Sequence, residues 1–208
     1  MIEILRDIFR PLYVFLKKQK GIFIVKNAVR KGNLKIVIGA GGEHEKGWIP
    51  TDIDFLNLLN ESDWSRFFHL GTIEMMVAEH VWEHLTLEES SQALKNCFAY
   101  LKPGGHLRIA VPDGNHSNPD YIEMVKPGGY GYGSDDHKVL YTISSLSVLL
   151  EKIGFKVKGL EYFDDNRRFV FTDWNPTGGK IRRSKRFDPR NAGSEMIYSS
   201  LIVDAIKE

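Results

Sequence analysis

Apolar runs alternate with helical patterns along this 208-residue chain. Residues 34–39, LKIVIG, are continuously apolar and rich in β-branched side chains, as in a parallel strand that is covered on both faces. Further strands are predicted at residues 48–54, 72–80, 106–113, 156–163 and 199–207. Strands that alternate with helices predict an α/β fold, and an antiparallel pair is expected at its C-terminal edge.

Two helices between these strands have clear end signals. Apolar residues recur at helical spacing from Leu87, and Thr86 with Glu89 has the T-x-x-E spacing of a capping box. The Pro-Gly-Gly sequence at 103–105 is expected to end this helix. A second helix is predicted within residues 143–155, ended by Gly154. The segment between residues 113 and 138 is rich in Gly, Asp and Tyr, and its length indicates a functional loop.

Residues 1–30 are predicted to form an N-terminal helical extension to a main domain at residues 31–208, which contains a basic insertion at 178–191. Packing of the extension onto the main domain is favoured over docking on a membrane surface. The helical spacing is carried by Ile4, Leu5, Ile8, Leu12, Phe15 and Leu16. Charged residues and a proline interrupt this segment, so neither a signal peptide nor a membrane span is expected, and the expected location is the cytoplasm.

Charge and cysteine content narrow the function classes. The formal net charge is +1, which gives no general signal for nucleic acid, and no RNA-binding motif is present. Cys97 is the only cysteine, so an intrachain disulfide and a cysteine-based zinc cluster are both excluded. A reducing compartment suits this composition.

His80, Glu83 and His84 have the H-x-x-E-H spacing of one class of zinc peptidases. That site needs both histidines on one face of a continuous helix. Here a predicted strand precedes the pair and the capping box of a new helix follows it, so the pair is expected in a strand-to-helix connection. We therefore expect no metal site.

Gly39, Ala40 and Gly41 follow the first strand and leave room for a ligand at its carboxyl end. Asp52 ends the next strand, where a carboxylate can accept hydrogen bonds from ribose hydroxyls. The intervening residues are too few for the helix that dinucleotide and P-loop sites place beneath phosphates. A cofactor with ribose and adenine but no phosphate fits best, and S-adenosylmethionine is the common one.

These motifs resemble those of class I S-adenosylmethionine-dependent methyltransferases, in particular a small group associated with surface-polysaccharide genes. The match covers about residues 33 to 208 and rests on IVIGAGG, GWIPTDID, AEHVWEHL, LKPGGHLRIAVPD and HKVLYTISSLSVLLEKIGF. It implies a Rossmann-like, mostly parallel sheet with an antiparallel C-terminal edge. The cofactor-binding residues that it implies are Gly39, Ala40, Gly41, Asp52, Ile53, Asp63, Glu79 and His80.

Two departures from that family stand out. Val37 occupies the place of an acid often found before the first glycine, so Glu79 is a candidate acceptor for the amino group of the cofactor. The first crossover helix is also missing.

Methyl transfer to a sugar hydroxyl needs alignment and a general base. Asp113, at the end of the strand predicted at 106–113, and His137, at the end of the long loop, are the candidate bases, with His116 and Asp136 behind them. The resemblance implies O-methylation of a saccharide or related metabolite in surface-polysaccharide synthesis. Methylation of another small molecule or a protein, and a non-catalytic cofactor-binding module, remain as alternatives.

Four further residues are candidates for acceptor binding. Tyr130 and Tyr132, which lie among glycines, suit a mobile lid or a stacking surface for a sugar ring. Arg182 and Arg183, in the basic insertion, suit a phosphorylated acceptor. The oligomeric state is left open.

Overall fold

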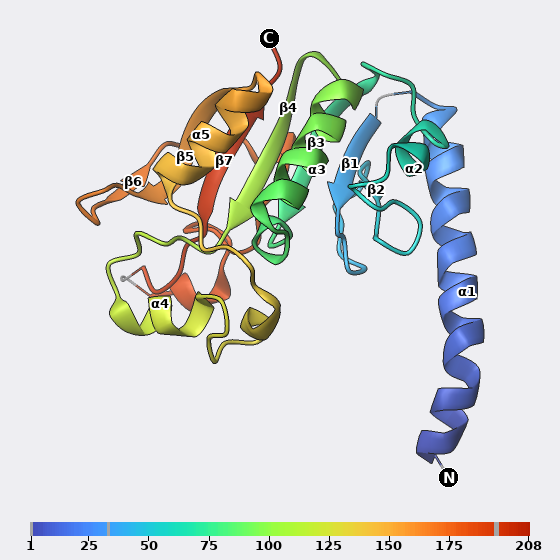
Figure 1. Ribbon diagram of the computed structural model, residues 1–208, viewed down its shortest axis with the longest axis horizontal. Coiled ribbons are helices and arrows are strands. Elements are labelled where there is room, and N and C mark those ends of the chain that lie inside the picture. The colour runs from blue at the N-terminus through green and yellow to red at the C-terminus, as the bar shows by residue number, and fades with distance from the viewer. Residues whose placement is uncertain (1, 33, 194–195) are drawn as a thin grey trace.

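A computed structural model describes the backbone of residues 2–32, 34–193 and 196–208, and the side chains of these residues except those of 2–11 and 13. In this part of the chain seven strands form one sheet, in the order β2-β1-β3-β4-β7-β5-β6 (Figure 1). The strands are β1 (Leu34–Ile38), β2 (Ile49–Pro50), β3 (Ile73–Glu79), β4 (Leu101–Val111), β5 (Lys156–Phe163), β6 (Phe169–Phe171) and β7 (Leu201–Ile206).

The sheet is parallel in its first half and antiparallel in its second. β1 pairs in parallel with β2 and β3, and β3 pairs in parallel with β4. β7 lies antiparallel between β4 and β5, and β6 extends the edge beyond β5. The predicted α/β fold, with an antiparallel C-terminal edge, is confirmed.

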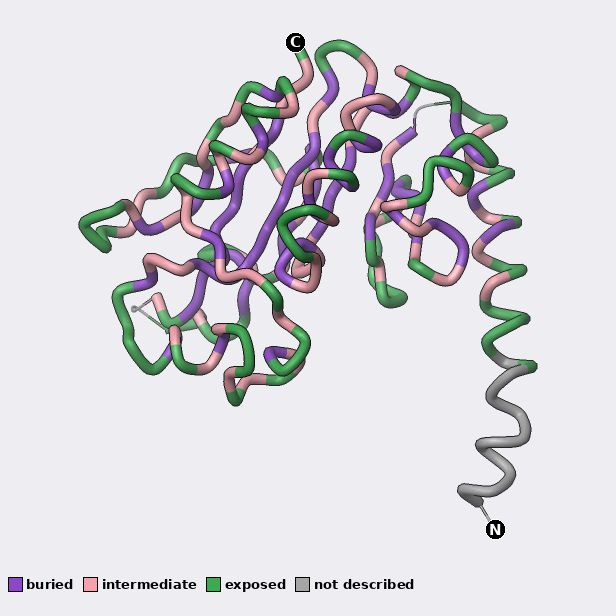
Figure 2. The backbone as a smooth tube through the Cα atoms, viewed as in Figure 1, coloured by how far each residue is buried: buried purple, intermediate pink, exposed green. Residues whose placement is uncertain are grey.

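Helices α3 (Leu87–Tyr100) and α5 (Ile143–Ile153) cover one face of the sheet (Figure 1). Alternate strand residues such as Met76 and Ala78 belong to the large core on that side, and the strands in Figure 2 are buried along most of their length. Val77 belongs instead to a second core that includes Trp174 and Ile181. The segment around the basic insertion therefore covers part of the opposite face.

Both predicted helix boundaries are confirmed. The Thr86 hydroxyl accepts the Glu89 N–H at 3.2 Å, and the Glu89 carboxylate accepts the Thr86 N–H at 2.8 Å, which completes the capping box of α3. Gly154 follows α5 with φ of 110°, a left-handed conformation that glycine adopts without strain.

Three local expectations were wrong or incomplete. β2 pairs only at Ile49–Pro50, and α3 passes directly into β4, so the glycines at 104–105 mark a register shift against β3 instead of a free turn. The long loop contains helix α4 (Pro119–Val125) and the short 3-10 helix η2 (Ser134–Asp136). Asn118 caps α4 and a proline is its first residue, a start signal that composition alone conceals.

The remaining helical segments are short, except for α1. They are α2 (Glu61–Ser65) and the 3-10 helices η1 (Trp82–His84), η3 (Pro176–Gly178) and η4 (Pro189–Asn191).

Helix α1 (Ile2–Val29) lies in the segment predicted as a helical extension, and part of it packs against the main core. Ile22 and Val25 are buried against the core, whereas Leu12, Phe15 and Leu16 are more than half exposed. Figure 1 shows the helix beside β2, with its N-terminal part extending beyond the sheet. Only the C-terminal half is thus held by the main domain, and the side chains of Ile4, Leu5 and Ile8 lie outside the described residues. No helix in the described part of the chain is long and apolar enough to cross a membrane.

Candidate active site

The turn after β1 brings backbone, not side chains, to the edge of a pocket. Gly39 and Gly41 have φ of 61° and 56°, values that favour glycine. A Cβ on Gly39 would lie 2.7 Å from the Cγ2 atom of Val81, so a larger residue would displace the chain that follows β3. The Ala40 N–H donates to the Thr51 carbonyl at 2.9 Å, which joins this turn to the end of β2.

Three cavities adjoin one another at the carboxyl ends of β1 and β3. The glycine-loop pocket, about 470 Å³, is lined by the turn at 37–45, Glu79, His80 and the start of the basic insertion. The histidine pocket, about 460 Å³, shares His80 and Arg183 with it. The helix-edge pocket, about 130 Å³, shares Ala40 with the glycine-loop pocket and is closed by α1. Ligands in neighbouring pockets would therefore lie side by side.

The structure separates the three predicted residues at 52–63. Asp52 lines the helix-edge pocket, where its carboxylate accepts the Ile53 N–H at 2.8 Å and lies 3.5 Å from the Lys17 ammonium. Ile53 is 72% exposed and lines none of the three pockets. Asp63 lines none of the three pockets; its carboxylate accepts the Asn57 N–H at 3.0 Å and orders the chain before α2.

Glu79 lines the glycine-loop pocket, where an acceptor for the amino group of the cofactor must lie. It also binds the backbone of the basic insertion. Its two carboxylate oxygens accept the backbone N–H groups of Arg182 and Arg183 at 3.0 and 2.7 Å. Each oxygen keeps a second lone pair. Glu79 thus fixes the wall of the pocket whether or not it contacts a ligand.

Two buried side chains anchor the same insertion from below. Arg108 donates to both oxygens of Asp204 at 2.7 and 2.9 Å, and to the carbonyl of Gly179 at 2.6 Å. The Glu161 carboxylate accepts hydrogen bonds from the Trp174 indole, the Lys185 backbone and the hydroxyl of Ser199. The insertion is therefore an ordered wall rather than a solvated charge run.

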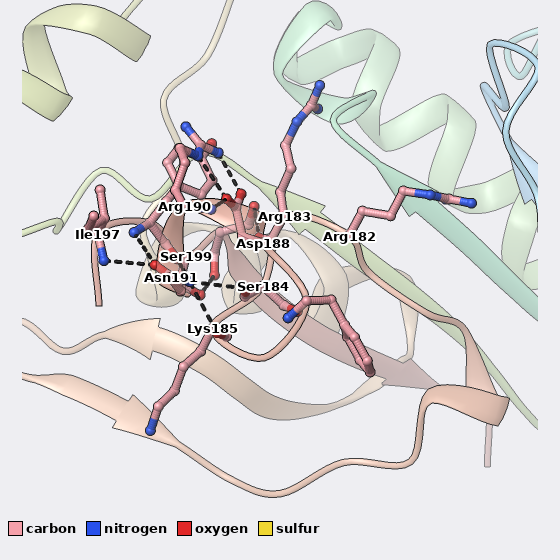
Figure 3. Close-up of polar contacts among 12 residues, drawn as sticks. Arg182, Arg183, Ser184, Lys185, Asp188, Arg190, Asn191, Ile197 and Ser199 are labelled. Carbon is pink, nitrogen blue, oxygen red and sulfur yellow. Dashed lines mark hydrogen bonds and ion pairs between the residues drawn. The ribbon is translucent and has the colours of Figure 1, made fainter. Parts of the chain in front are cut away.

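Most cations of this wall are paired with carboxylates. Arg183 and Lys185 are the exceptions among the described residues, and the Lys185 ammonium lies over the Phe171 ring, 4.4 Å from its centroid. Arg182 lies 3.0 Å from Glu43 and 3.3 Å from Glu45, both on the glycine loop, so the pair spans the glycine-loop pocket. Arg190 pairs with Asp188 at 2.6 Å. Figure 3 shows the side chains of Arg182 and Arg183 directed away from the Arg190–Asp188 pair. Among the described residues the Arg183 guanidinium has no hydrogen-bonded partner.

His137 lies in the histidine pocket, as a base acting on an acceptor must. Its Nδ1 atom is 2.7 Å from the carbonyl oxygen of Val125. A carbonyl only accepts, so Nδ1 carries the proton and Nε2 of the neutral ring keeps a free lone pair. His84 packs edge-on against this ring, with centroids 4.9 Å apart. Asp136, at 66% exposure, lies 3.3 Å from His84 Nδ1.

Asp113 does not share that place, which corrects the sequence prediction. It is fully buried and lines none of the three pockets; its carboxylate accepts the backbone N–H groups of Phe163 at 2.7 Å and Asn115 at 2.9 Å. Burial raises its pKa to about 6. His116 stacks on Tyr121, and burial lowers its pKa to about 4. Both side chains are used in packing the end of β4.

The raised pKa of Asp113 should make the free energy of unfolding depend on pH. Because the folded pKa is about 6 and the ordinary value 3.8, the native state binds more protons than the unfolded state between these pH values. The contribution of this carboxyl should therefore be fully present below pH 4 and fall by about 3 kcal/mol as pH rises past 6. Urea unfolding between pH 4 and 7 should show that wild type loses stability relative to Asp113→Asn as the pH rises. A stability difference that stays constant over this range would contradict the prediction.

The two tyrosines of the long loop occupy different positions. Tyr132 is fully exposed and lines the mouth of the histidine pocket. Tyr130 lies outside the pockets, and its hydroxyl donates to the Asp120 carbonyl at 3.2 Å. Sequence reasoning missed Tyr198 and treated Arg190 only as one of the cations of the basic insertion, although both line the same pocket. Glu83 was named only as part of the H-x-x-E-H spacing and the AEHVWEHL motif, not as a residue of an acceptor pocket.

Comparison with known proteins identifies the class. A family model described as a methyltransferase domain matches residues 25–159. The chain belongs to this methyltransferase family. No curated protein matches the chain at a significant level.

Solved structures of methyltransferases share the fold at low sequence identity. A methyltransferase of Thermotoga maritima, described as a possible histamine N-methyltransferase, is 14% identical with a TM-score of 0.50; 98% of this chain and 97% of that one are covered. An S-adenosylmethionine-dependent methyltransferase of Mesorhizobium loti is 12% identical with a TM-score of 0.50, over 86% and 95% of the two chains. The protein is a methyltransferase, and its cofactor is S-adenosylmethionine.

The residues at the carboxyl ends of β1 and β2 fit that cofactor. The glycines at 39 and 41 leave backbone at the floor of the glycine-loop pocket, where a Cβ on Gly41 would meet nothing within 4 Å. Asp52, Ala40 and the helix-edge pocket provide a carboxylate beside an apolar cleft, as a ribose and a base require. Glu79 and His80 line the opposite side.

Asp52→Ala is expected to weaken S-adenosylmethionine binding by more than tenfold. Two ribose hydrogen bonds to a charged acceptor would be lost, at about 1.5 to 3 kcal/mol each. Asp63→Ala is the matched control, since it removes a carboxylate that lines no pocket. Calorimetry that showed equal affinities for wild type and Asp52→Ala would remove the ribose role.

Proposed function

We propose that this enzyme methylates an oxygen of a saccharide or related metabolite, and that the acceptor occupies the histidine pocket. The observation that carries the proposal is that His80 and Arg183 line both the glycine-loop pocket and the histidine pocket. An acceptor in the second pocket would lie beside a methyl donor in the first. Alignment of the two reactants supplies much of the rate enhancement.

The residues of the histidine pocket suit activation of a hydroxyl. Bound S-adenosylmethionine supplies a methyl group on positive sulfur, so that the oxygen–methyl bond forms as the methyl–sulfur bond breaks and its electron pair stays on sulfur. The acceptor must lose its hydroxyl proton in the same step. The free lone pair on His137 Nε2 activates that hydroxyl, a role typically worth about a hundred- to ten-thousand-fold.

Charge in the pocket favours an acceptor that carries an anionic group. Arg183 reaches the pocket without a hydrogen-bonded side-chain partner among the described residues, and Arg190 lies beside it over the Tyr198 ring, 3.6 Å from its centroid. A phosphorylated saccharide offers a phosphate to Arg183 and a sugar face to Tyr132 at the mouth. The saccharide class, and its use in surface-polysaccharide synthesis, are supported by resemblance to that group of methyltransferases.

Labelled methyl transfer tests this proposal. S-adenosylmethionine with a tritiated methyl group is incubated with the enzyme and with fractionated cell-envelope material, free sugars, sugar phosphates and nucleotide-linked sugars. We expect label in an alkali-stable ether on a phosphorylated saccharide. Label in protein would contradict the saccharide acceptor and indicate a protein methyltransferase. Intact cofactor binding with no label in any fraction would favour the non-catalytic binding module.

A further inference from the structure

Three potential metal ligands meet in the histidine pocket. Glu83, His84 and His137 each bring one ligand atom, and these atoms lie within 4.8 Å of one another. Glu83 and His84 come from η1, and His137 comes from the far end of the long loop. Backbone hydrogen bonds join the two segments, because the Glu83 carbonyl accepts the Lys138 N–H at 2.6 Å. The three side chains are thus held together by the fold.

The ion pair that reaches the Glu83 carboxylate among the described residues is with His80, and it carries charge only if His80 is protonated. Glu83 is 1% exposed, and neither of its carboxylate oxygens has a hydrogen bond. His80 Nδ1 lies 2.9 Å from one oxygen, without hydrogen-bond geometry. Ser200 donates its single hydroxyl proton to the Arg183 carbonyl at 2.8 Å, so His80 Nε2 carries the proton given to Ser200. The buried Glu83 carboxylate is therefore available to bind a cation in the pocket.

The histidines have the arrangement of metal ligands. His137 donates Nδ1–H to a backbone carbonyl, which fixes its tautomer and leaves Nε2 free, as metal-bound histidines commonly do. His84 Nδ1 lies 3.3 Å from the Asp136 carboxylate, without hydrogen-bond geometry, so this ring has no fixed partner among the described residues. His80 has φ of 56°, a rare conformation for a non-glycine residue, at the residue that turns the chain into η1.

We propose that Glu83, His84 and His137 bind a divalent first-row transition-metal ion in the histidine pocket. Two imidazoles and one carboxylate suit manganese, iron, cobalt or zinc, whereas magnesium and calcium prefer oxygen ligands alone. Three protein ligands leave open positions for an acceptor. This is not the peptidase arrangement, because η1 ends at His84 and His80 is bonded to Ser200. The sequence analysis expected no metal site because His80 and His84 do not lie on one continuous helix. The site proposed here does not need that helix, because its ligands are Glu83, His84 and His137.

With the ion bound, the His137 Nε2 lone pair is a ligand, so the ion takes over from this histidine the activation of the acceptor hydroxyl. This part of the inference rests on the proposed function. A metal ion lowers the pKa of a bound hydroxyl, so its proton passes to water in the pocket while the oxygen stays in place for methylation. Arg183 lies in the same pocket and repels a cation, but the charge of Glu83 and of an anionic acceptor offsets it. The binding claim itself does not depend on the acceptor.

Metal binding by the untagged, chelator-treated full chain tests the inference. Cobalt(II) titration followed by visible absorption, with calorimetry for manganese, zinc and magnesium, should show one transition-metal ion per chain and at least about a hundredfold weaker magnesium binding. Glu83→Gln, His84→Ala and His137→Ala should each weaken cobalt binding at least about a hundredfold, the most that loss of an outer-shell partner costs. His69→Ala, an exposed histidine outside the pockets, should not change it.

S-adenosylmethionine affinity, measured on the same samples, shows that each variant is folded. If Glu83→Gln does not fold, the two histidine variants decide. Absence of saturable cobalt binding in wild type, or equal binding in His84→Ala and His137→Ala, would overturn the site. Binding without methylation of any saccharide would support the metal site and contradict the proposed acceptor. Methylation at an unchanged rate after chelation would support the acceptor and overturn the role of the ion.

Discussion

Replacement of His137 by alanine is expected to reduce turnover at least about a hundredfold while leaving S-adenosylmethionine binding intact. The reason is positional, because His137 lines the histidine pocket and not the glycine-loop pocket. Its free Nε2 activates the acceptor hydroxyl, directly or through a bound ion. Initial rates with labelled donor at saturating acceptor measure the effect, and calorimetry measures cofactor affinity.

The matched control is His69→Ala, which removes an imidazole from the exposed turn before β3 and should retain wild-type turnover. Equal turnover in wild type and His137→Ala would move the reacting hydroxyl away from this histidine. Asp113 would again be the candidate base if Asp113→Asn lost turnover while His137→Ala kept it, and if the unfolding free energies of wild type and Asp113→Asn had the same pH dependence. Those two results would place the acceptor at the end of β4, outside the histidine pocket.

Local signals predicted the elements whose ends are set by neighbouring residues. The capping box at Thr86 and the glycine at 154 were read correctly because each satisfies backbone groups within one turn of its helix. The strand at 34–38 was readable because both of its faces are covered, which leaves an uninterrupted apolar run. Fold class follows from such elements in order.

The candidate site was predictable only in part, because its walls come from distant segments. The cofactor side was predicted from glycines and an acid that are close in the chain. Gly39 and Ala40 line the glycine-loop pocket, and Ala40 and Asp52 line the helix-edge pocket beside it. The acceptor side depends on contacts between segments far apart, such as the Glu83 carbonyl with the backbone of residue 138. No local pattern shows that Asp113 turns into the core.

The roles of the charged residues in the basic insertion also could not be predicted from the sequence alone. As sequence, a run rich in lysine and arginine reads as a solvated face or a ligand site. In the structure Glu79 and Glu161 bind its backbone, and most of its cations are paired. Arg183 differs because its side chain faces the two pockets. The strand carboxylates of Glu79 and Glu161 thus fix the backbone of the insertion, which places the Arg183 side chain at the two pockets.

Arg108→Met is expected to lower the free energy of unfolding by about 3 to 5 kcal/mol, because it leaves Asp204 unpaired at only 14% exposure. The Gly179 carbonyl and the Trp174 ring would lose the same guanidinium, so the insertion should loosen and cofactor affinity should fall as well. Lys102→Met is the control, since Lys102 and Glu74 form an exposed pair worth at most about 1 kcal/mol.

A double-mutant cycle separates the charge effect from the anchoring effect. Arg108→Met with Asp204→Leu removes both charges, and stability should recover much of the loss because no buried carboxylate is left unpaired. Cofactor affinity should not recover, because the bond from Arg108 to the Gly179 carbonyl is still missing. Urea unfolding and calorimetry on the four proteins give both quantities. If affinity and stability recover together, the insertion is held by Glu79 and Glu161 alone, and Arg108 acts only through its charge.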